Sequence, residues 1–387
     1  MKKSVFKKKR PIKIVILIDA WYPVFGGGQV HVSEISKRLV KDKRCQIEII
    51  TSKLGMKNVK NEKITNNDYF KIIRLGPAFS FENLFGRIFY LFFALFYLLF
   101  NDYDIIHAHA FLPGIPAKLA SIIKRKPVVF TVHGIVKNSW DEISSYKIIS
   151  YFYRWIENLI LFNLHYDFQI SVSEDFLRYK NVNKKIEIIP NGVDVKIFNS
   201  VKTIKDKDFK IIFVGRLHPQ KGLIYLLKAM VLVIREIKNV YLILVGDGKL
   251  KKYLKNESKK LKLADKIIFK GELKGKKLIK EYKTSHLFVL PSIYEGQPLT
   301  LLEAWAAKIP VVVTDVGANK NFVENGKNGY LVSPKNPKAL AEKIIFVLKN
   351  QNWDFLGENG YKMVKKNYSW DSAVEKTYQV YLKVLNK

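Results

Sequence analysis

Short runs of β-branched and other apolar residues recur along the chain, and segments of helical length separate them. In the first half the runs lie at 12–18, 46–51, 105–108, 128–132, 168–172 and 186–189. In the second half they lie at 210–214, 241–245, 266–269, 287–290, 311–314 and 329–332. Apolar runs that alternate with helices are typical of a parallel sheet covered on both faces. The pattern predicts an α/β protein made of two doubly wound, Rossmann-like units.

The boundary between the two units is predicted at the turn Pro190-Asn-Gly-Val-Asp194. Its proline and its Asn-Gly pair favour a turn, and a polar, charged stretch follows. At 387 residues the chain is also longer than one hydrophobic core usually organises. We expect an N-terminal domain over 1–195, a C-terminal domain over 196–370, and a helix over 371–387 that packs back toward the N-terminal domain. A ligand would bind between the domains, where parallel strands present their carboxyl ends.

The longest apolar run, Ile88–Phe100, leaves two interpretations open. Its thirteen residues fall short of the about 20 that a transmembrane helix needs. A helix that is apolar on all sides must be buried in protein or lie in a lipid interface. The aromatic segment 146–168 slightly favours the second interpretation. The chain begins with basic residues, as signal peptides do, but 11–18 contains a lysine and runs into Asp19 without a cleavage pattern, so we expect the first strand there.

Composition narrows the partners and the compartment. The single cysteine, Cys45, excludes internal disulfides and multi-cysteine zinc sites, and it fits a reducing cytoplasm. The net charge of +33 is spread over both halves and should attract nucleotides, polyanions or anionic membranes. Helix-turn-helix, zinc-finger and RNA-binding signatures do not stand out, so no specific nucleic acid is predicted. We expect a cytoplasmic protein, with peripheral contact to the inner face of the cell membrane as an option.

Three consecutive glycines, Gly26, Gly27 and Gly28, lie between the first predicted strand and the first predicted helix. Glycines there let backbone amides approach an anion, and a helix N-terminus adds a favourable dipole. The spacing matches neither the dinucleotide fingerprint nor the P-loop. The alternative is a flexible turn, but one glycine would suffice for that. We therefore favour contact with an anion.

Histidines occur at the ends of two predicted strands. His107 and His109 should point to the same face of an extended chain, because side chains alternate along a strand. A histidine pair could bind a metal ion, but no zinc-protease pattern accompanies it. We interpret His109 as a substrate contact. His133, followed by Gly134, is a second candidate, and the alternative for each is a structural histidine.

In the second half, Arg216 and Lys221 share a glycine-bounded loop after a predicted strand. A guanidinium and an ammonium held together suit a diphosphate. Gly215 and Gly246, each at a predicted strand end, would let the backbone come close to such a ligand. Alone this is a weak signal, because many α/β proteins have such turns.

The segment 290–307 reads as a strand, a tight loop and a helix with two glutamates. If the helix begins near Pro298, Glu295 lies in the loop and Glu303 lies more than one turn inside the helix. The two carboxylates could then contact different parts of one long ligand. The helix N-terminus would offer free amides where charge develops on a leaving phosphate. The alternative is a pair of solvated helix carboxylates.

Taken together, these motifs resemble glycosyltransferase family 4, a group of retaining enzymes with the two-domain GT-B fold. The match runs from about Lys13 to Trp370. Its most specific elements are Gly215-Arg216-Leu217 with Lys221-Gly222, the turn 190–194, and the two glutamates within a Pro-Ser-x-x-Glu-Gly-x-Pro-x-x-x-x-Glu-Ala frame. One departure is Pro298, where many members have glycine.

The resemblance implies a role for each motif. The glycine loop would close over the donor diphosphate, and Arg216 with Lys221 would clamp it. Glu295 would hold the hydroxyls of the donor sugar, Glu303 the ribose, and His109 would lie beside the reacting sugar. The implied catalytic residues are His109 and Glu295. The implied donor-binding residues are Gly26, Gly27, Gly28, His133, Gly215, Arg216, Lys221, Gly246, Gly296, Gln297, Pro298, Leu299 and Glu303.

The implied activity is transfer of a sugar from a nucleotide-diphosphate sugar to an acceptor hydroxyl with retained anomeric configuration. The resemblance implies synthesis of a glycan, glycolipid or cell-surface polysaccharide, an N-terminal acceptor side and a C-terminal donor side, and no cofactor or bound metal. Two alternatives remain: a sugar-nucleotide epimerase or phosphorylase of the same architecture, and a non-catalytic basic module for membranes or nucleic acids. The base, the sugar and the acceptor stay open.

Overall fold

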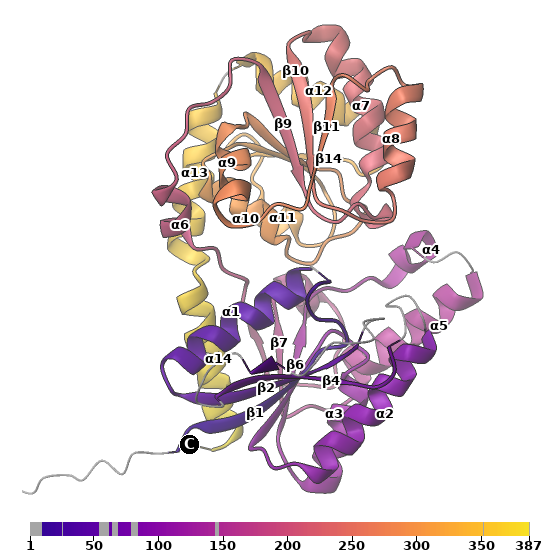
Figure 1. Cartoon of the computed structure of the whole chain (residues 1–387), viewed down its shortest axis with the longest axis vertical. Helices are drawn as coiled ribbons and strands as arrows, with labels where there is room; N and C mark the ends of the chain where they lie inside the picture. The colour runs from indigo at the N-terminus through magenta and orange to yellow at the C-terminus, as the bar shows by residue number, and fades with distance from the viewer. Residues whose placement is uncertain are drawn as a thin grey trace, which may run out of the picture.

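The alternating pattern folds into two parallel sheets, one in each half of the chain (Figure 1). The computed structural model describes residues 10–24, 26–53, 62–63, 69–78, 84–143, 147–350 and 352–386. The basic start of the chain and Tyr146 therefore lie outside the described residues. Helices cover both faces of each sheet, as the continuous apolar strands require. This is the two-domain GT-B arrangement.

The N-terminal sheet has the order β3-β4-β2-β1-β5-β6-β7-β8. All its neighbours run parallel except β3, a two-residue antiparallel edge strand. Strand β1 lies near the middle, where Ile14 pairs with Ile47 on one side and Ile105 on the other. The strands are β1 Ile12–Leu17, β2 Cys45–Ser52, β3 Glu62–Lys63, β4 Phe70–Leu75, β5 Ile105–His109, β6 Val128–Val132, β7 Phe168–Ser171 and β8 Ile186–Ile188.

The C-terminal sheet is wholly parallel, with the order β11-β10-β9-β12-β13-β14. Its first strand is again central, so both sheets reverse their winding direction beside it. The strands are β9 Phe209–Val214, β10 Val240–Val245, β11 Ile267–Gly271, β12 Leu287–Leu290, β13 Val311–Thr314 and β14 Tyr330–Val332.

Every predicted strand is present, but the sequence analysis missed the two-residue β3 and the longer β4. The residues of β4 alternate between buried and half-buried, because β4 lies next to the edge of the sheet. The alternation interrupts the apolar run that identified the other strands.

The helices connect successive strands and cover the faces of the two sheets. In the N-terminal half they are α1 Gly27–Lys41, α2 Leu84–Phe100, α3 Gly114–Lys124, α4 Trp140–Ile143 and α5 Lys147–Asn158, which a π-helical turn, Leu159–Asn163, extends. The C-terminal half has α6 Val195–Ser200, α7 Leu223–Glu236, α8 Lys251–Lys260, α9 Gly275–Thr284, α10 Leu299–Ala306, α11 Asn319–Phe322, α12 Pro337–Asn350, α13 Trp353–Asn367 and α14 Trp370–Val384.

Helix α2, which contains the apolar run, has one buried face and one exposed face. Tyr90, Ala94 and Leu98, spaced by four, are fully buried against the sheet. On the opposite side Phe92 and Phe96 are exposed. One face is therefore core and the other is open. Within the described residues, no helix is both long and apolar enough to cross a membrane.

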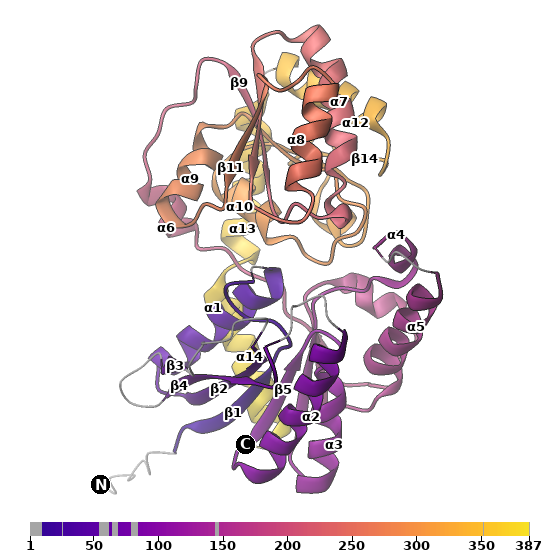
Figure 2. The same cartoon turned by 45° about the vertical axis from the view of Figure 1, so that its right-hand side comes forward.

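The last helix returns to the first domain. Helix α14 packs against α1, and Trp370, Val374 and Tyr381 belong to the N-terminal hydrophobic core (Figures 1 and 2). The connector between the domains, residues 190–194, contacts the segment just before α14, where the N–H of Val193 donates to the carbonyl of Tyr368 at 2.9 Å. The two domains are thus joined by two chain crossings that lie side by side.

Candidate active site

A cavity of about 510 Å³ lies between the two sheets, at the carboxyl ends of their central strands. That volume lies within the range that drug-sized ligands and cofactors occupy. Its N-terminal wall includes the glycines after β1, the start of the loop after β6, and Asn191 of the connector. Its C-terminal wall includes the loops after β9, β10 and β12 and the first turn of α10. Both walls are needed to complete the cavity.

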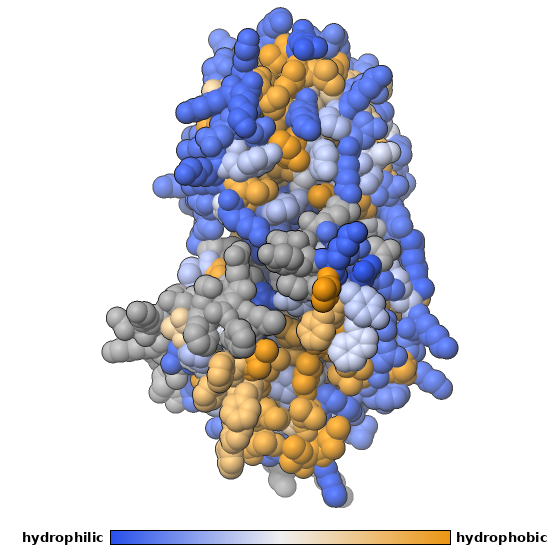
Figure 3. Space-filling view, turned by 90° about the vertical axis from the view of Figure 1, so that its right-hand side faces the viewer, coloured by the Kyte–Doolittle hydropathy of each residue, from blue (hydrophilic) through white to orange (hydrophobic). Residues whose placement is uncertain are grey.

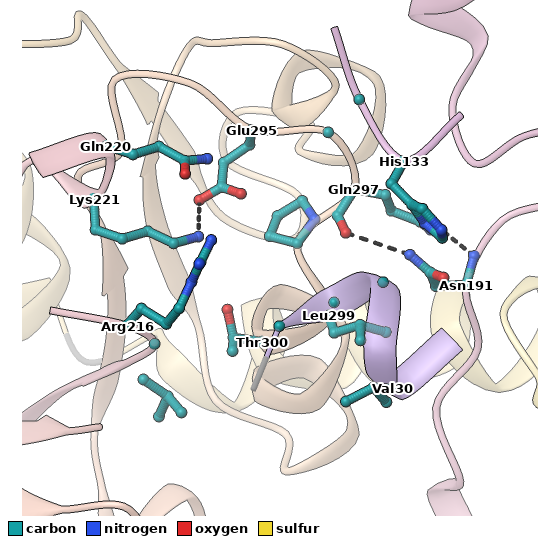
Figure 4. Close-up of a pocket in the computed structure, with 18 of the residues that line it drawn as sticks. Val30, His133, Asn191, Arg216, Gln220, Lys221, Glu295, Gln297, Leu299 and Thr300 are labelled. Atoms are coloured by element: carbon teal, nitrogen blue, oxygen red, sulfur yellow. Dashed lines mark hydrogen bonds and ion pairs between the residues drawn. The ribbon is translucent and has the colours of Figure 1, made fainter. Parts of the chain in front are cut away.

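The two cations of the C-terminal wall face a buried carboxylate. The Nζ of Lys221 lies 2.5 Å from Oε1 of Glu295, and the hydroxyl of Ser292 donates to the same oxygen at 2.5 Å. The Lys221 side chain is 15% exposed and that of Glu295 6%. Figure 4 shows Arg216 extending toward the same space. This corner can bind an anion and a hydroxyl-bearing group side by side.

Two glycines allow the close approach of loops in this wall. Gly246, with φ of +131°, ends β10, and a Cβ there would lie 2.0 Å from the carbonyl oxygen of Gly215. A Cβ on Gly296 would lie 2.0 Å from the carbonyl oxygen of His133, in the other domain. Any side chain at Gly296 would push the domains apart.

Glu303 lies apart from this corner, inside α10. The helix begins at Leu299 with Pro298 as its N-cap, as the sequence predicts. The hydroxyl of Tyr282 donates to Oε2 of Glu303 at 2.9 Å, and burial raises the pKa of Glu303 to about 7. The first turn of α10 has no side-chain cap, and the N–H of Leu301 donates to the carbonyl of Pro298 at 3.1 Å, so the amides of Leu299 and Thr300 are the ones that can meet an anion.

Four histidines gather at the N-terminal wall, where His133 lines the cavity and His31, His107 and His109 are buried behind it. His31 approaches Asn191, with Nδ1 and Oδ1 2.8 Å apart, and His107 contacts Tyr381 of α14 and Thr131 of β6, each at 2.7 Å. Burial lowers the pKa of His31 to about 4 and that of His107 to about 3. It lowers the pKa values of His109 and His133 further below their ordinary value. All four rings are therefore neutral near pH 7.

The contact between His109 and His133 determines which nitrogen of His133 carries a proton. Nδ1 of His109 lies 3.1 Å from Nε2 of His133, and Nε2 of His109 is buried without a partner. A buried N–H without an acceptor costs more than a buried lone pair without a donor. The favoured arrangement has His109 Nδ1–H donating to His133 Nε2. His133 then carries its proton on Nδ1, which has no hydrogen bond to the described residues.

The structure brings nearly all the predicted site residues to the cavity. Glu295 and all the residues predicted to bind the donor line it. His109 does not, because its side chain is buried behind His133, one strand further into the sheet. Alternation correctly placed His107 and His109 on one face, with ring centroids 4.1 Å apart, but it could not tell how deep that face lies.

Sequence reasoning missed Asn191, Gln220 and Tyr294, which also line the cavity. Asn191 was read only as part of a turn. Its backbone N–H donates to Oε1 of Gln297 at 2.5 Å, so it links the connector to the loop before α10 (Figure 4). An Asn-Gly pair signals a turn, and nothing in it signals this contact.

Within the described ranges, no group of three or more His, Cys, Asp or Glu side chains is arranged to hold a metal ion. Positive charge faces the cavity from the lining residues Arg216, Lys221 and Lys274 and from the N-terminus of α10.

Comparison with known proteins is consistent with this geometry over nearly the whole chain. The model of glycosyltransferase family 4 matches residues 25–197, and that of the glycosyl transferases group 1 matches residues 194–369. An uncharacterised glycosyltransferase of Methanocaldococcus jannaschii is 27% identical, over 95% of this chain and 97% of the relative. The UDP-Gal:α-D-GlcNAc-diphosphoundecaprenol α-1,3-galactosyltransferase of Escherichia coli is 29% identical, over 74% of this chain and 77% of the relative. The sucrose-phosphate synthase structure of Thermosynechococcus elongatus superposes with a TM-score of 0.82 at 21% identity, and the match covers 97% of this chain and 99% of that one.

Proposed function

Because the chain belongs to glycosyltransferase family 4, whose retaining enzymes use nucleotide sugars, we propose that its donor is a UDP-hexose and its acceptor a lipid-linked sugar at a membrane surface. The observation that carries the donor half is that Arg216, Lys221, Glu295 and Glu303 all line one cavity between the two domains. The Escherichia coli relative supports UDP, because its name records UDP-Gal as donor.

The diphosphate would lie between Arg216, Lys221 and the first turn of α10. Glu303 would accept hydrogen bonds from the ribose, and Glu295 from hydroxyls of the sugar. Lys221 pairs with Glu295, and we propose that the ammonium turns toward the phosphate when the donor enters. The glycine loop before α1 would then cover the diphosphate.

Chemistry at the sugar would need no side-chain nucleophile. The bond between C1 and the phosphate oxygen breaks, the acceptor oxygen bonds to C1 on the same face, and the acceptor proton passes to the departing phosphate. Charge grows on the diphosphate, where the cations and helix amides stabilise it. We assign the position beside the sugar to His133, because His133 lines the cavity and His109 lies behind it. His109 becomes a residue that positions His133.

The membrane half of the proposal rests on an apolar outer face of the N-terminal domain (Figure 3). We call this the α2–α3 face; its exposed residues are Ile88, Phe89, Phe92, Phe93, Phe96, Phe100, Leu119, Ile122 and Ile123. Neither helix contains an Asp or Glu, and α3 adds Lys118 and Lys124. Apolar side chains beside lysines and without carboxylates suit the interface of an anionic bilayer.

The donor half is tested by incubating the protein with UDP-, GDP- and ADP-linked hexoses and following their slow hydrolysis. This assay needs no acceptor. We expect UDP-hexose to be turned over at least about tenfold faster than the others. Turnover of GDP- or ADP-hexose alone would reject the UDP assignment, and turnover of none would reject the site.

The membrane half is tested by sedimentation with vesicles of phosphatidylglycerol or phosphatidylcholine at low salt. We expect binding to the anionic vesicles only, and its loss in the double variant Phe92→Ser, Phe96→Ser. The matched control is Phe346→Ser, Phe355→Ser, which removes two exposed phenylalanines from the C-terminal domain. Equal loss in both double variants, or dimerisation through the α2–α3 face instead, would contradict the proposal.

A further inference from the structure

The N-terminal wall of the cavity contains an apolar strip that the donor residues leave unused. Phe111, Val136 and Leu161 line it, opposite the charged C-terminal wall. A nucleotide sugar held by the cations and Glu303 has its polar groups on that opposite wall. The strip therefore faces the side from which an acceptor would enter.

Aromatic rings continue from this strip to the outer surface. The ring of Phe111 meets that of Trp140 edge to face, with centroids 5.8 Å apart. Trp140 stacks on Tyr153 at 4.8 Å. On α5, Tyr153 neighbours Phe152 at 6.3 Å, and Phe152 stacks on Trp155 at 6.2 Å. We call these five residues the aromatic track.

Trp140 is held in a fixed orientation beside Phe111, which lines the cavity. Its Nε1–H donates to Oε2 of the buried Glu157 at 2.9 Å. The same carboxylate accepts the backbone N–H groups of Val136 and Lys137, at 2.7 and 2.8 Å. Helix α4, which begins at Trp140, packs against the 3₁₀ turn Pro219–Lys221 of the other domain. The track therefore passes beside the donor cations.

The outer end of the track is open. Ile148, Tyr151, Phe152 and Trp155 on α5 are 85%, 69%, 47% and 54% exposed. The single carboxylate of α5, Glu157, is buried. A cluster that served only to fold the domain would be closed at both ends, whereas this one is exposed to solvent on α5 and to the cavity at Phe111.

We propose that the aromatic track binds the acceptor, as an amphiphile whose hydrocarbon chain lies on α5 and whose hydroxyl-bearing head reaches the cavity past Trp140 and Phe111. Flat rings bury methylene groups and also stack on sugar rings, which suits both parts of such a molecule. The inference rests on the proposed function, and it adds the path by which a lipid-linked acceptor reaches the donor.

The probe is a series of alkyl β-D-glucosides with methyl, octyl and dodecyl chains, titrated calorimetrically below micelle formation in the presence of UDP. Full burial of one methylene gives about a fourfold gain in affinity. A methylene that is half covered by the track should therefore give about a twofold gain. We expect affinity to rise steadily from methyl to dodecyl in the wild-type protein.

Two variants separate the ends of the track. Trp155→Ser, at an exposed site, should weaken dodecyl glucoside binding about tenfold and leave methyl glucoside unchanged. Phe111→Ala should weaken all three glucosides. The controls are Phe96→Ser on the α2–α3 face and Phe355→Ser in the other domain, and neither should alter the series.

Three outcomes overturn the inference: affinity that is independent of chain length, loss in Phe96→Ser without loss in Trp155→Ser, or equal loss in Phe355→Ser. UDP-glucose binding is measured in Trp155→Ser, Phe96→Ser and Phe355→Ser, whose side chains do not line the cavity, and it should be unchanged in all three. A wild-type protein that binds no UDP-sugar would reject the proposed function, whereas one that binds the donor but ignores chain length rejects only the track.

Discussion

The two domains share one architecture but make their halves of the cavity in different ways. The C-terminal wall uses charged side chains on short loops that follow strand ends, and each of its motifs is continuous in sequence. The N-terminal wall uses the neutral His133, apolar side chains such as Phe111, Val136 and Leu161, and Asn191 of the connector, which come from segments far apart in the chain. The proposed donor side is therefore built locally, whereas the proposed acceptor side is built by tertiary packing.

The largest effect should come from the charged corner of the C-terminal wall. Lys221→Ala or Glu295→Ala should lower transfer, and donor hydrolysis with it, about 10²–10³-fold, because the first removes preorganised charge at the leaving group and the second removes the carboxylate that orients the sugar. Steady-state kinetics measures this. Lys349→Ala, which removes an equal charge from an exposed ion pair with Glu236, should be active. Full activity in both corner variants would refute the donor assignment.

On the histidine side, the test is whether His109 sets the tautomer of His133. His109→Asn retains an N–H that donates to Nε2 and should keep most activity. His109→Asp instead accepts a proton from Nε2, moves the proton of His133 away from Nδ1, and should lower kcat about 10–100-fold. The ¹⁵N shifts of the His133 ring report the tautomer directly. Identical shifts and rates in the two variants would show that His109 is only a packing residue.

The buried histidines should also make the N-terminal domain sensitive to acid. His31 has its pKa lowered to about 4 in the folded state, against about 6.5 when unfolded. Below pH 6.5 the unfolded chain takes up a proton that the folded chain refuses, so stability falls as the pH falls toward 4. At pH 5 the loss is about 2 kcal/mol, or about 30-fold in the unfolding equilibrium.

Urea unfolding at pH 7 and pH 5 measures this loss, and hydrogen exchange should show α1 and β1 opening before α7 and β9. In His31→Asn the difference in the free energy of unfolding between pH 7 and pH 5 should be smaller, by the amount that the protonation of His31 contributes. An unchanged difference would mean that other groups cause the acid sensitivity.

The smallest effect should be the pH dependence of donor binding through Glu303. With a pKa of about 7, its carboxyl is ionised above neutrality and accepts ribose hydroxyls only in that form. Affinity for UDP-glucose should fall about tenfold from pH 8 to pH 6. Fluorescence titration of Glu303→Gln with UDP-glucose should give a weaker affinity that does not change with pH. If the affinity of the variant falls with pH as steeply as that of the wild-type protein, groups other than Glu303 cause the pH dependence.

The strands and the donor residues could be predicted from sequence because their signals are local. A continuous apolar run identifies a buried strand wherever it lies, which found β1 and β9 but missed β4, whose alternation reflects its place near the edge of the sheet. Gly215, Arg216 and Lys221 are recognisable together because one loop carries them. The helix start near Pro298 was equally readable.

What the sequence alone determined is the fold class and the chemistry of the donor side, because hydrophobic periodicity and short loops act within a few residues of each other. Only the tertiary structure decided that His133 and not His109 reaches the cavity, that Asn191 contacts Gln297, and that Trp140 connects α5 to Phe111. These relations depend on the depth of a side chain in a sheet and on the meeting of segments far apart in the chain. No local pattern encodes either.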